Sequence, residues 1–303
     1  MKIASRFHRM VYPAVATLSL FAATTCQADD AQTQKLTTTT VTEQVYMLSG
    51  QGGNIGVFVG NDGTFLIDDQ FAPMTDKIVA AIKAVGGSYP KFLINTHYHG
   101  DHSGGNENLG KGGTLIFSHD NVRARLSAGS FIKEFNMKTA RMPDQGLPVV
   151  TFSEDISFHL NGDRVQAMHT PHAHTDGDSF IHFKESNVIH AGDLFFNGFY
   201  PFIDVDHGGS LKGMIAAVDQ ILLLADDETK IIPGHGPLSS KAQLQSYRQM
   251  LQLSYERLRK LKVDGKTATE AVAAKPLADL EAEWGDGFLK GDQWIEITYP
   301  GIY

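Results

Sequence analysis

The feature that most constrains this 303-residue chain is a dense group of histidines behind a short apolar run. The run Phe92-Leu93-Ile94 predicts a buried strand, and it leads into Thr96-His97-Tyr98-His99-Gly100-Asp101-His102. On an extended backbone, residues i and i+2 project from the same face about 6–7 Å apart, so His97 and His99 can both reach one metal ion at roughly 2 Å. Asp101 and His102, beyond Gly100, can then reach a second ion. The pattern predicts a metal site rather than a histidine-rich surface loop.

The N-terminal segment has the features of a secretory signal peptide. Three basic residues precede a stretch of apolar and small residues from 11 to 23, and small residues lead up to Ala28. We therefore expect residues 1–28 to be removed and the rest to be periplasmic or secreted. Lipoprotein processing at Cys26 is the alternative, although the residues before it lack the preferred leucine. No later segment approaches the ~20 apolar residues of a membrane span, so no membrane association is expected after cleavage.

Composition limits both the chemistry and the partners. Cys26 is the only cysteine, so cleavage after Ala28 removes disulfides and thiolate ligands from the mature chain. A hydrophobic content of 42% supports one sizeable core. The net charge of −8 disfavours nucleic acid and anionic membranes as partners. We expect a small-molecule substrate, with a monomer or a homodimer as the assembly.

Many short strand patterns come first, with helical patterns between and after them, and this order favours two sheets packed face to face and covered by helices. We expect a single domain over 29–303, with a core at 41–238 and a helical C-terminal extension at 239–303 packed on it. Thr75 is the expected N-cap of the first helix. The expected strands are 45–48, 55–59, 64–67, 91–95, 114–117, 149–152, 156–160, 165–169, 179–183, 188–190, 230–232 and 295–299, and the expected helices are 75–86, 210–224, 241–261, 267–274 and 277–284.

Three later strand ends offer further ligands for a two-metal site. His174 lies in a turn-rich segment after the strand that ends at His169. Asp193 follows a glycine at the end of another strand, and His235 is flanked by glycines that leave room for an ion. The sequence thus supplies enough imidazole and carboxylate groups for two ions.

These blocks, HxHxDH followed by HTxG, GD and GHG, resemble the metallo-β-lactamase superfamily in order across Gln44 to Leu238. The resemblance implies an α+β fold, an αββα sandwich of two mixed β-sheets flanked by helices, with the site at one edge. It implies a second-sphere role for Asp68, which matches a position that supports the ligand loop. It also implies one metal held by His97, His99 and His174, a second held by Asp101, His102 and His235, and Asp193 as the bridge.

The expected mechanism is hydrolysis by activated water. Two divalent ions about 3.5–4 Å apart can share a water and lower its pKa toward neutrality, while Asp101 orients the nucleophile or passes its proton on. Nitrogen-rich ligands favour zinc, and iron or manganese stay open. The chain has no GxSxG elbow, so a serine nucleophile is not indicated.

The substrate is less defined. We expect an exported dinuclear hydrolase that attacks an ester, thioester, lactone or amide carbonyl, with β-lactams among the amides. Phe196 stands where related β-lactamases have a lysine that grips the drug's carboxylate, and the block Gly192 to Phe196 looks like glyoxalase II and related thioesterases. The other hypothesis is a non-hydrolytic member with a redox or metal-binding accessory role in the periplasm.

Aromatic residues after Asp193 are candidates for substrate binding. Phe196, Phe199 and Tyr200 would lie near the mouth of the site, unless they pack under the sheet edge instead. A second group, in the irregular stretch between the two strand-rich halves, could form a facing wall or lid. This second group is Phe131, Phe135, Met137 and Met142.

Overall fold

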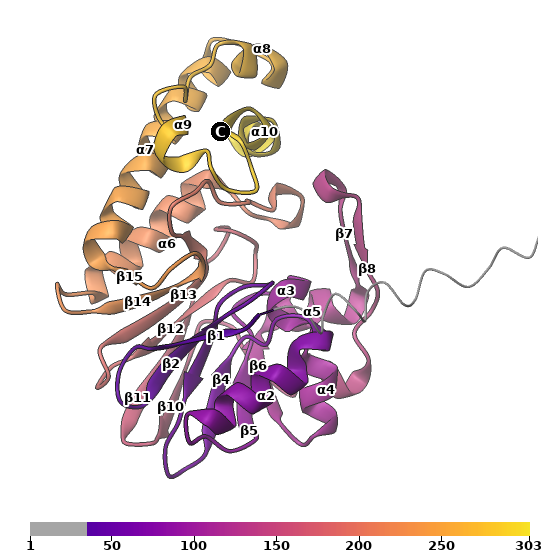
Figure 1. The fold of residues 1–303 in the computed structure, drawn as a ribbon. Coiled ribbons are helices and arrows are strands. Elements are labelled where there is room, and N and C mark those ends of the chain that lie inside the picture. Colours follow the sequence, from indigo (N-terminus) through magenta and orange to yellow (C-terminus); the bar gives the residue numbers. More distant parts are fainter. Residues whose placement is uncertain (1–34) are drawn as a thin grey trace, which may run out of the picture. The chain divides into compact units, whose positions relative to one another are not determined.

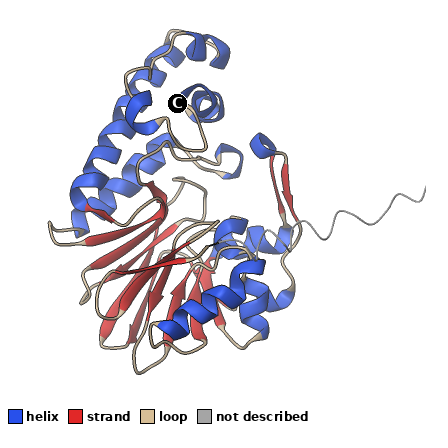
Figure 2. Cartoon of the chain, in the orientation of Figure 1, coloured by secondary structure: helices blue, strands red, loops and turns tan. Residues whose placement is uncertain are grey.

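The structure, a computed structural model, describes residues 35–303, and the predicted signal peptide at 1–28 lies outside them. Two β-sheets pack face to face, and helices cover the outer face of each (Figure 1). Figure 2 shows the two layers of strands between the flanking helices. The predicted α+β class and αββα sandwich are therefore confirmed.

The first sheet has the order β1-β2-β3-β4-β5-β6-β9 and is mixed. Its first four strands form an antiparallel meander, whereas β4, β5, β6 and β9 run parallel. Parallel neighbours bring their carboxyl ends to the same edge, so the loop after β5 leaves the sheet there. The strands are Thr37–Thr40 (β1), Val45–Ser49 (β2), Ile55–Phe58 (β3), Thr64–Ile67 (β4), Pro90–Ile94 (β5), Leu115–His119 (β6) and Val150–Phe152 (β9).

The second sheet has the order β10-β11-β12-β13-β14-β15. Only β13 and β14 pair in parallel, so this sheet is mixed as well. A separate hairpin, β7–β8, lies in the sequence between β6 and β9 of the first sheet. The strands are Ser130–Ile132 (β7), Met137–Thr139 (β8), Asp155–Leu160 (β10), Asp163–His169 (β11), Ser179–Phe183 (β12), Val188–Phe196 (β13), Lys230–His235 (β14) and Ser239–Ser240 (β15).

Alternating side chains explain the layers. In β4, Phe65 and Ile67 enter the core between the sheets, while Leu66 points to the helix-covered face. The sheets touch through rings such as Phe58 and Phe183, whose centroids are 5.3 Å apart. Both faces of such a strand are buried, so a run of four apolar or small residues is what this position requires.

Helices complete the sandwich. α2 and α4 cover the first sheet, and α6 and α7 cover the second (Figure 1). The helices are Thr75–Ala84 (α2), Gly100–Ser103 (α3), Asn106–Lys111 (α4), Asp120–Ala128 (α5), Leu211–Leu224 (α6), Lys241–Val263 (α7), Ala268–Ala273 (α8), Glu281–Trp284 (α9) and Gly291–Thr298 (α10). Short 3-10 turns lie at Ala72–Met74 (η1), Lys133–Phe135 (η2), Asp144–Gly146 (η3), Val205–His207 (η4) and Tyr299–Gly301 (η5).

Two local predictions are wrong. Thr75 is the first residue of α2 and not its N-cap, because η1 already brings the chain into a helical conformation at Met74. The expected strand at 295–299 is instead part of α10, in which Trp294, Ile295 and Thr298 are buried at helical spacing. Packing of this apolar face against the rest of the protein stabilises the helix.

The segment after residue 238 packs on the second sheet. Side chains of α7 and α10 belong to one buried cluster with side chains of β13 and α6. Within residues 35–303, no helix has both the length and the apolar character needed to cross a membrane.

Trp294→Ala should lower the free energy of unfolding by about 3–5 kcal/mol, since it empties a large buried site. Trp294 is fully buried, stacks on Tyr200 at 4.8 Å between ring centroids, and donates a hydrogen bond to the Pro201 carbonyl. Urea unfolding measures the loss. Leu223→Ala, at a side chain 85% exposed on α6, is the control and should stay within about 0.5 kcal/mol of wild type. A loss below about 1 kcal/mol for Trp294→Ala would show that α10 contributes little to the core.

Candidate metal centre

The segment after β5 carries four of the predicted site residues. The strand ends at Ile94, and the next residues bend rather than continue in an extended conformation. His97 and His99 lie in this bend, with ring centroids 4.8 Å apart. Asp101 and His102 lie on the short helix α3, which begins at Gly100. A bend and a helical turn, rather than one extended run, therefore bring these side chains to the edge of the sheets.

The second sheet supplies the other three residues at its matching edge. His174 lies in the loop between β11 and β12, and His235 ends β14. Asp193 lies within β13, which is longer than predicted, just after a register shift at Gly192. Gly192 has a φ of 52°, and a Cβ there would lie 2.8 Å from the Thr96 side chain. This glycine lets the strand bulge toward the facing sheet at the point where Asp193 is presented.

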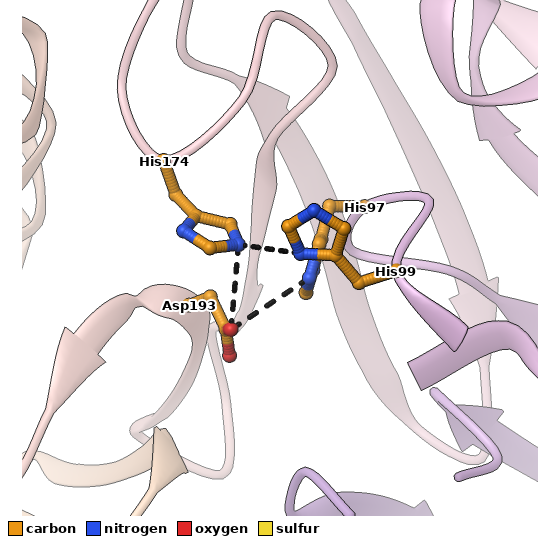
Figure 3. Close-up of side chains that lie close together, drawn as sticks. All are labelled: His97, His99, His174 and Asp193. Carbon is orange, nitrogen blue, oxygen red and sulfur yellow. Dashed lines mark hydrogen bonds and ion pairs between the residues drawn. The ribbon is translucent and has the colours of Figure 1, made fainter. Parts of the chain in front are cut away.

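The first group of side chains surrounds one oxygen of Asp193 (Figure 3). Asp193 Oδ2 lies 3.7 Å from His97 Nε2 and 3.4 Å from His174 Nε2. His174 Nε2 lies 2.9 Å from His99 Nδ1. All members of this group are buried. Three imidazoles and one carboxylate oxygen thus converge on one point.

The second group surrounds the other oxygen of the same carboxylate. Asp193 Oδ1 lies 3.0 Å from His102 Nε2 and 3.4 Å from His235 Nε2. Asp101 Oδ2 lies 3.3 Å from His235 Nε2. Asp101 and His235 are 29% and 23% exposed, so this group forms the accessible side of the site. The structure brings all seven sequence-predicted residues together, with Asp193 between the groups.

Hydrogen bonds fix which imidazole nitrogen faces inward. His174 Nδ1 donates to the Phe202 carbonyl at 2.8 Å, and His102 Nδ1 donates to Asp68 at 2.8 Å. His99 differs, because its Nε2 faces the Asp204 carboxylate at 3.0 Å and its Nδ1 faces the centre. With the outer nitrogen donating, the inner nitrogen of a neutral imidazole carries a lone pair.

A metal fits this arrangement of lone pairs. Burial lowers the pKa of His174 to about 4 and lowers that of His97 well below its ordinary value, so both are neutral. His97 Nε2 is buried and has no hydrogen-bond partner. His99 Nδ1 and His174 Nε2 lie 2.9 Å apart, close enough for both nitrogens to bind the same cation. Imidazole and carboxylate donors with fixed outer hydrogen bonds are the ligand set of a divalent transition metal.

Asp68 connects the two ligand segments. It is fully buried at the end of β4, and its Oδ2 accepts from His102 Nδ1 and, at 2.7 Å, from the Thr96 hydroxyl. Its Oδ1 accepts from the Thr96 amide at 2.7 Å. Thr96 Oγ1 in turn lies 3.0 Å from His97 Nδ1. One carboxylate thereby connects to an imidazole from each group, directly to His102 and through Thr96 to His97.

Asp204 is a positioning residue that sequence reasoning missed. Its carboxylate accepts hydrogen bonds from Tyr98, from His99 Nε2 and, at 2.7 Å, from His207 Nδ1. Burial alone would raise the pKa of Asp204, but the hydrogen bonds from His99 and Tyr98 outweigh burial and lower it. Asp204 belongs to no recognisable block, since it stands in an irregular segment 11 residues after Asp193. No local signal marked it.

Two glycines allow the ligands to approach one another. A Cβ on Gly234 would lie 2.1 Å from Asp193 Oδ1, and a Cβ on Gly53 would lie 2.0 Å from His102 Cε1. The sequence suggested that the glycine before His235 makes room for an ion. In the structure it makes room for the Asp193 carboxylate.

The predicted aromatic residues differ in their placement. Phe196 is buried and stacks on His235 with a centroid distance of 5.1 Å, and Phe199 is half-buried beside it. Tyr200 is fully buried against Trp294, so it packs under the sheet edge and we leave it out of the surface proposed to bind substrate. His190 is also buried, with Nε2 3.1 Å from the Asn54 carbonyl, as expected for a packed histidine.

Comparison with known proteins identifies the family. The metallo-beta-lactamase superfamily model matches residues 48–235, which is more than half of the chain. A probable hydroxyacylglutathione hydrolase, glo2, of Schizosaccharomyces pombe is 27% identical over 211 residues, covering 67% of this chain and 71% of that protein. The acyl-coenzyme A thioesterase MBLAC2 of Bos taurus is 25% identical over 169 residues, covering 48% of this chain and 56% of that protein.

Solved structures agree on the fold. A metallo-beta-lactamase from Pontibacter korlensis superposes with a TM-score of 0.58 at 18% identity, covering 72% of this chain and 99% of that one. The matched region of the family model includes every one of the seven converging side chains. The chain belongs to the metallo-beta-lactamase superfamily.

Proposed function

We propose that this chain is an exported, dinuclear metal-dependent hydrolase that cleaves thioesters. One observation supports it most strongly: imidazole nitrogens of five histidines converge on the two oxygens of the buried Asp193 carboxylate. Of the relatives, one is named a probable hydroxyacylglutathione hydrolase and another an acyl-coenzyme A thioesterase. Other carbonyl substrates, namely esters, lactones and amides including β-lactams, are secondary candidates.

The two groups define the proposed metal ligands. His97, His99 and His174 would hold one ion, and Asp101, His102 and His235 the other, with Asp193 shared between them. The nitrogen-rich donor set favours zinc over iron or manganese. Two such ions, when bound, lower the pKa of water and polarise a substrate carbonyl. Export to the periplasm or the cell exterior is proposed from the N-terminal sequence, whose basic residues and apolar stretch are typical of a signal peptide.

The protein's own groups would orient the reaction. Asp101 is the proposed catalytic carboxylate, because it is partly exposed and its Oδ2 can accept a proton from attacking water. Asp204 and the Phe202 carbonyl hold His99 and His174 in fixed ring orientations. Phe196 lies against His235 and stands where related β-lactamases have a lysine. Because no basic group at position 196 can bind a substrate carboxylate, β-lactams are disfavoured.

A substrate panel tests the proposal. Zinc-loaded protein should show its highest kcat/KM on acyl thioesters, at least tenfold above its value on a chromogenic β-lactam. An ester, a lactone and a phosphodiester complete the panel. His97→Ala should abolish turnover, and His159→Ala, at an exposed histidine of β10, should not change it. Absence of thioester turnover, or a higher kcat/KM on the β-lactam or the phosphodiester than on thioesters, would contradict the proposed function.

Asp68→Asn should weaken metal binding about 10–100-fold, since it removes the charge that orients His102 and, through Thr96, His97. Asparagine tolerates the left-handed backbone at this position, where φ is 61°, so the fold should persist. Competition with a chromophoric chelator measures the affinity, and exposed Asp227→Asn is the control. If the Asp68→Asn and Asp227→Asn variants bound zinc with equal affinity, Asp68 would not support the metal ligands.

A further inference from the structure

We propose that an aromatic wall beside the metal centre binds the apolar acyl group of the substrate. The aromatic wall is defined as Phe135, Phe196, Phe199, Phe202 and Phe288. This inference rests on the proposed hydrolase function and adds the substrate class, namely thioesters with a long or aromatic acyl group.

The inner rings of the wall contact the proposed ligands. Phe196 stacks on His235, with an interplanar angle of 20°. Phe202 lies with its ring centroid 5.8 Å from those of both His99 and His174. Both rings are buried, so they connect the metal centre to the outer rings, which an acyl group would contact directly.

The outer rings extend this surface toward solvent. Phe199 lies 5.8 Å from Phe196 and 6.4 Å from Phe288 between ring centroids. Phe135 lies 4.9 Å from Phe202 and 6.2 Å from Phe288. The five rings form a continuous series of neighbours drawn from three segments: the β7–β8 hairpin, the end of β13 with the loop that follows it, and the turn between α9 and α10.

The outer rings are exposed on a protein that buries most of its aromatic side chains. Phe288 is 55% exposed and Phe135 is 38% exposed. Exposed apolar patches of this kind mark binding surfaces. The row from Phe288 through Phe199 leads to His235, which with Asp101 forms the accessible side of the metal centre. A substrate that enters from solvent thus meets apolar rings and reactive groups together.

The surrounding charges favour an uncharged group. Lys133, next to the hairpin tip, pairs with Asp206 at 2.7 Å and also lies near Glu134. Lys290 donates to the Gly285 carbonyl at 2.7 Å and lies 3.5 Å from Asp286. These two lysines thus have anionic or carbonyl partners, and the carboxylates of Glu134, Asp206 and Asp286 disfavour an anionic group here.

The hairpin that carries Phe135 is anchored. Ile132 is buried in the main hydrophobic cluster, and the Lys133–Asp206 ion pair joins η2 to η4. Anchoring on both sides holds Phe135 in place before substrate arrives, which reduces the entropy lost on binding.

Acyl-chain selectivity tests the wall. Zinc-loaded protein is assayed with acetyl and octanoyl thioesters of N-acetylcysteamine, a thiol without charge. Each methylene taken from water contributes roughly fourfold in affinity, so kcat/KM should be at least tenfold higher for octanoyl than for acetyl. Phe288→Ala and Phe135→Ala should each lower that ratio about tenfold. Leu223→Ala, which removes an exposed side chain on α6, should keep the wild-type ratio.

The outcomes separate the two proposals. If wild type hydrolyses no thioester, the proposed function fails and this inference fails with it. If wild type hydrolyses both thioesters but shows no chain-length preference, or if both phenylalanine variants keep that preference, only the aromatic wall is overturned. Calorimetry of octanamide on metal-depleted protein gives a readout without turnover. Phe288→Ala should bind at least fivefold more weakly, and equal binding would contradict the wall.

Discussion

Asp193→Asn is expected to lower kcat/KM on the best substrate by on the order of a thousandfold, equivalent to about 4 kcal/mol of transition-state stabilisation. Both carboxylate oxygens of Asp193 are used: Oδ2 faces His174 and Oδ1 faces His102. Asparagine has the shape of aspartate but no charge. Its side-chain NH2 group is a hydrogen-bond donor, and it would face one of the two groups of proposed ligand nitrogens. Steady-state kinetics of the metal-loaded variant measures the loss.

The variant should fold normally, because the core between the sheets is built from apolar side chains that do not include Asp193. Circular dichroism and urea unfolding check this, and Asp227→Asn at an exposed position is the matched control. A folded Asp193→Asn protein with more than a tenth of the wild-type rate would show that the bridging carboxylate is dispensable.

Metal removal is the second prediction with a large effect. Dialysis against a chelator should lower the rate by on the order of a thousandfold, because it removes the ions that would lower the pKa of water and polarise the carbonyl. Zinc should restore it. Removal should also destabilise the protein, since His97 Nε2 is then buried without a partner.

Two measurements accompany this prediction. Elemental analysis shows whether the dialysed protein is free of metal, and thermal unfolding with and without zinc shows the change in stability. Full activity in protein shown to be metal-free would contradict the proposed hydrolase mechanism.

The candidate site could be predicted from the sequence because its parts lie in short, contiguous blocks. The block from His97 to His102 follows a strand, and His174, Asp193 and His235 each lie at or near a strand end. Strand ends meet at sheet edges, so residues distant in the sequence can be assigned to one place. The layered fold was predicted from the order of strand and helix patterns and from the family resemblance.

What the sequence did not reveal depends on packing between distant segments. Asp204 supports His99 from an irregular segment, and its role depends on a contact across 105 positions. The aromatic wall joins three segments, and no local pattern separates exposed Phe288 from buried Tyr200. The sequence predicted a strand where α10 lies, because five residues are too few to distinguish helical from strand spacing of apolar side chains.

Metal stoichiometry tests the central claim most directly. After zinc reconstitution and desalting, elemental analysis should find two zinc ions per wild-type chain. His235→Ala should retain about one, since it disrupts only the group with Asp101 and His102. His159→Ala should retain two. A wild-type chain that binds no zinc, or a His235→Ala chain that still binds two ions with wild-type affinity, would contradict the account.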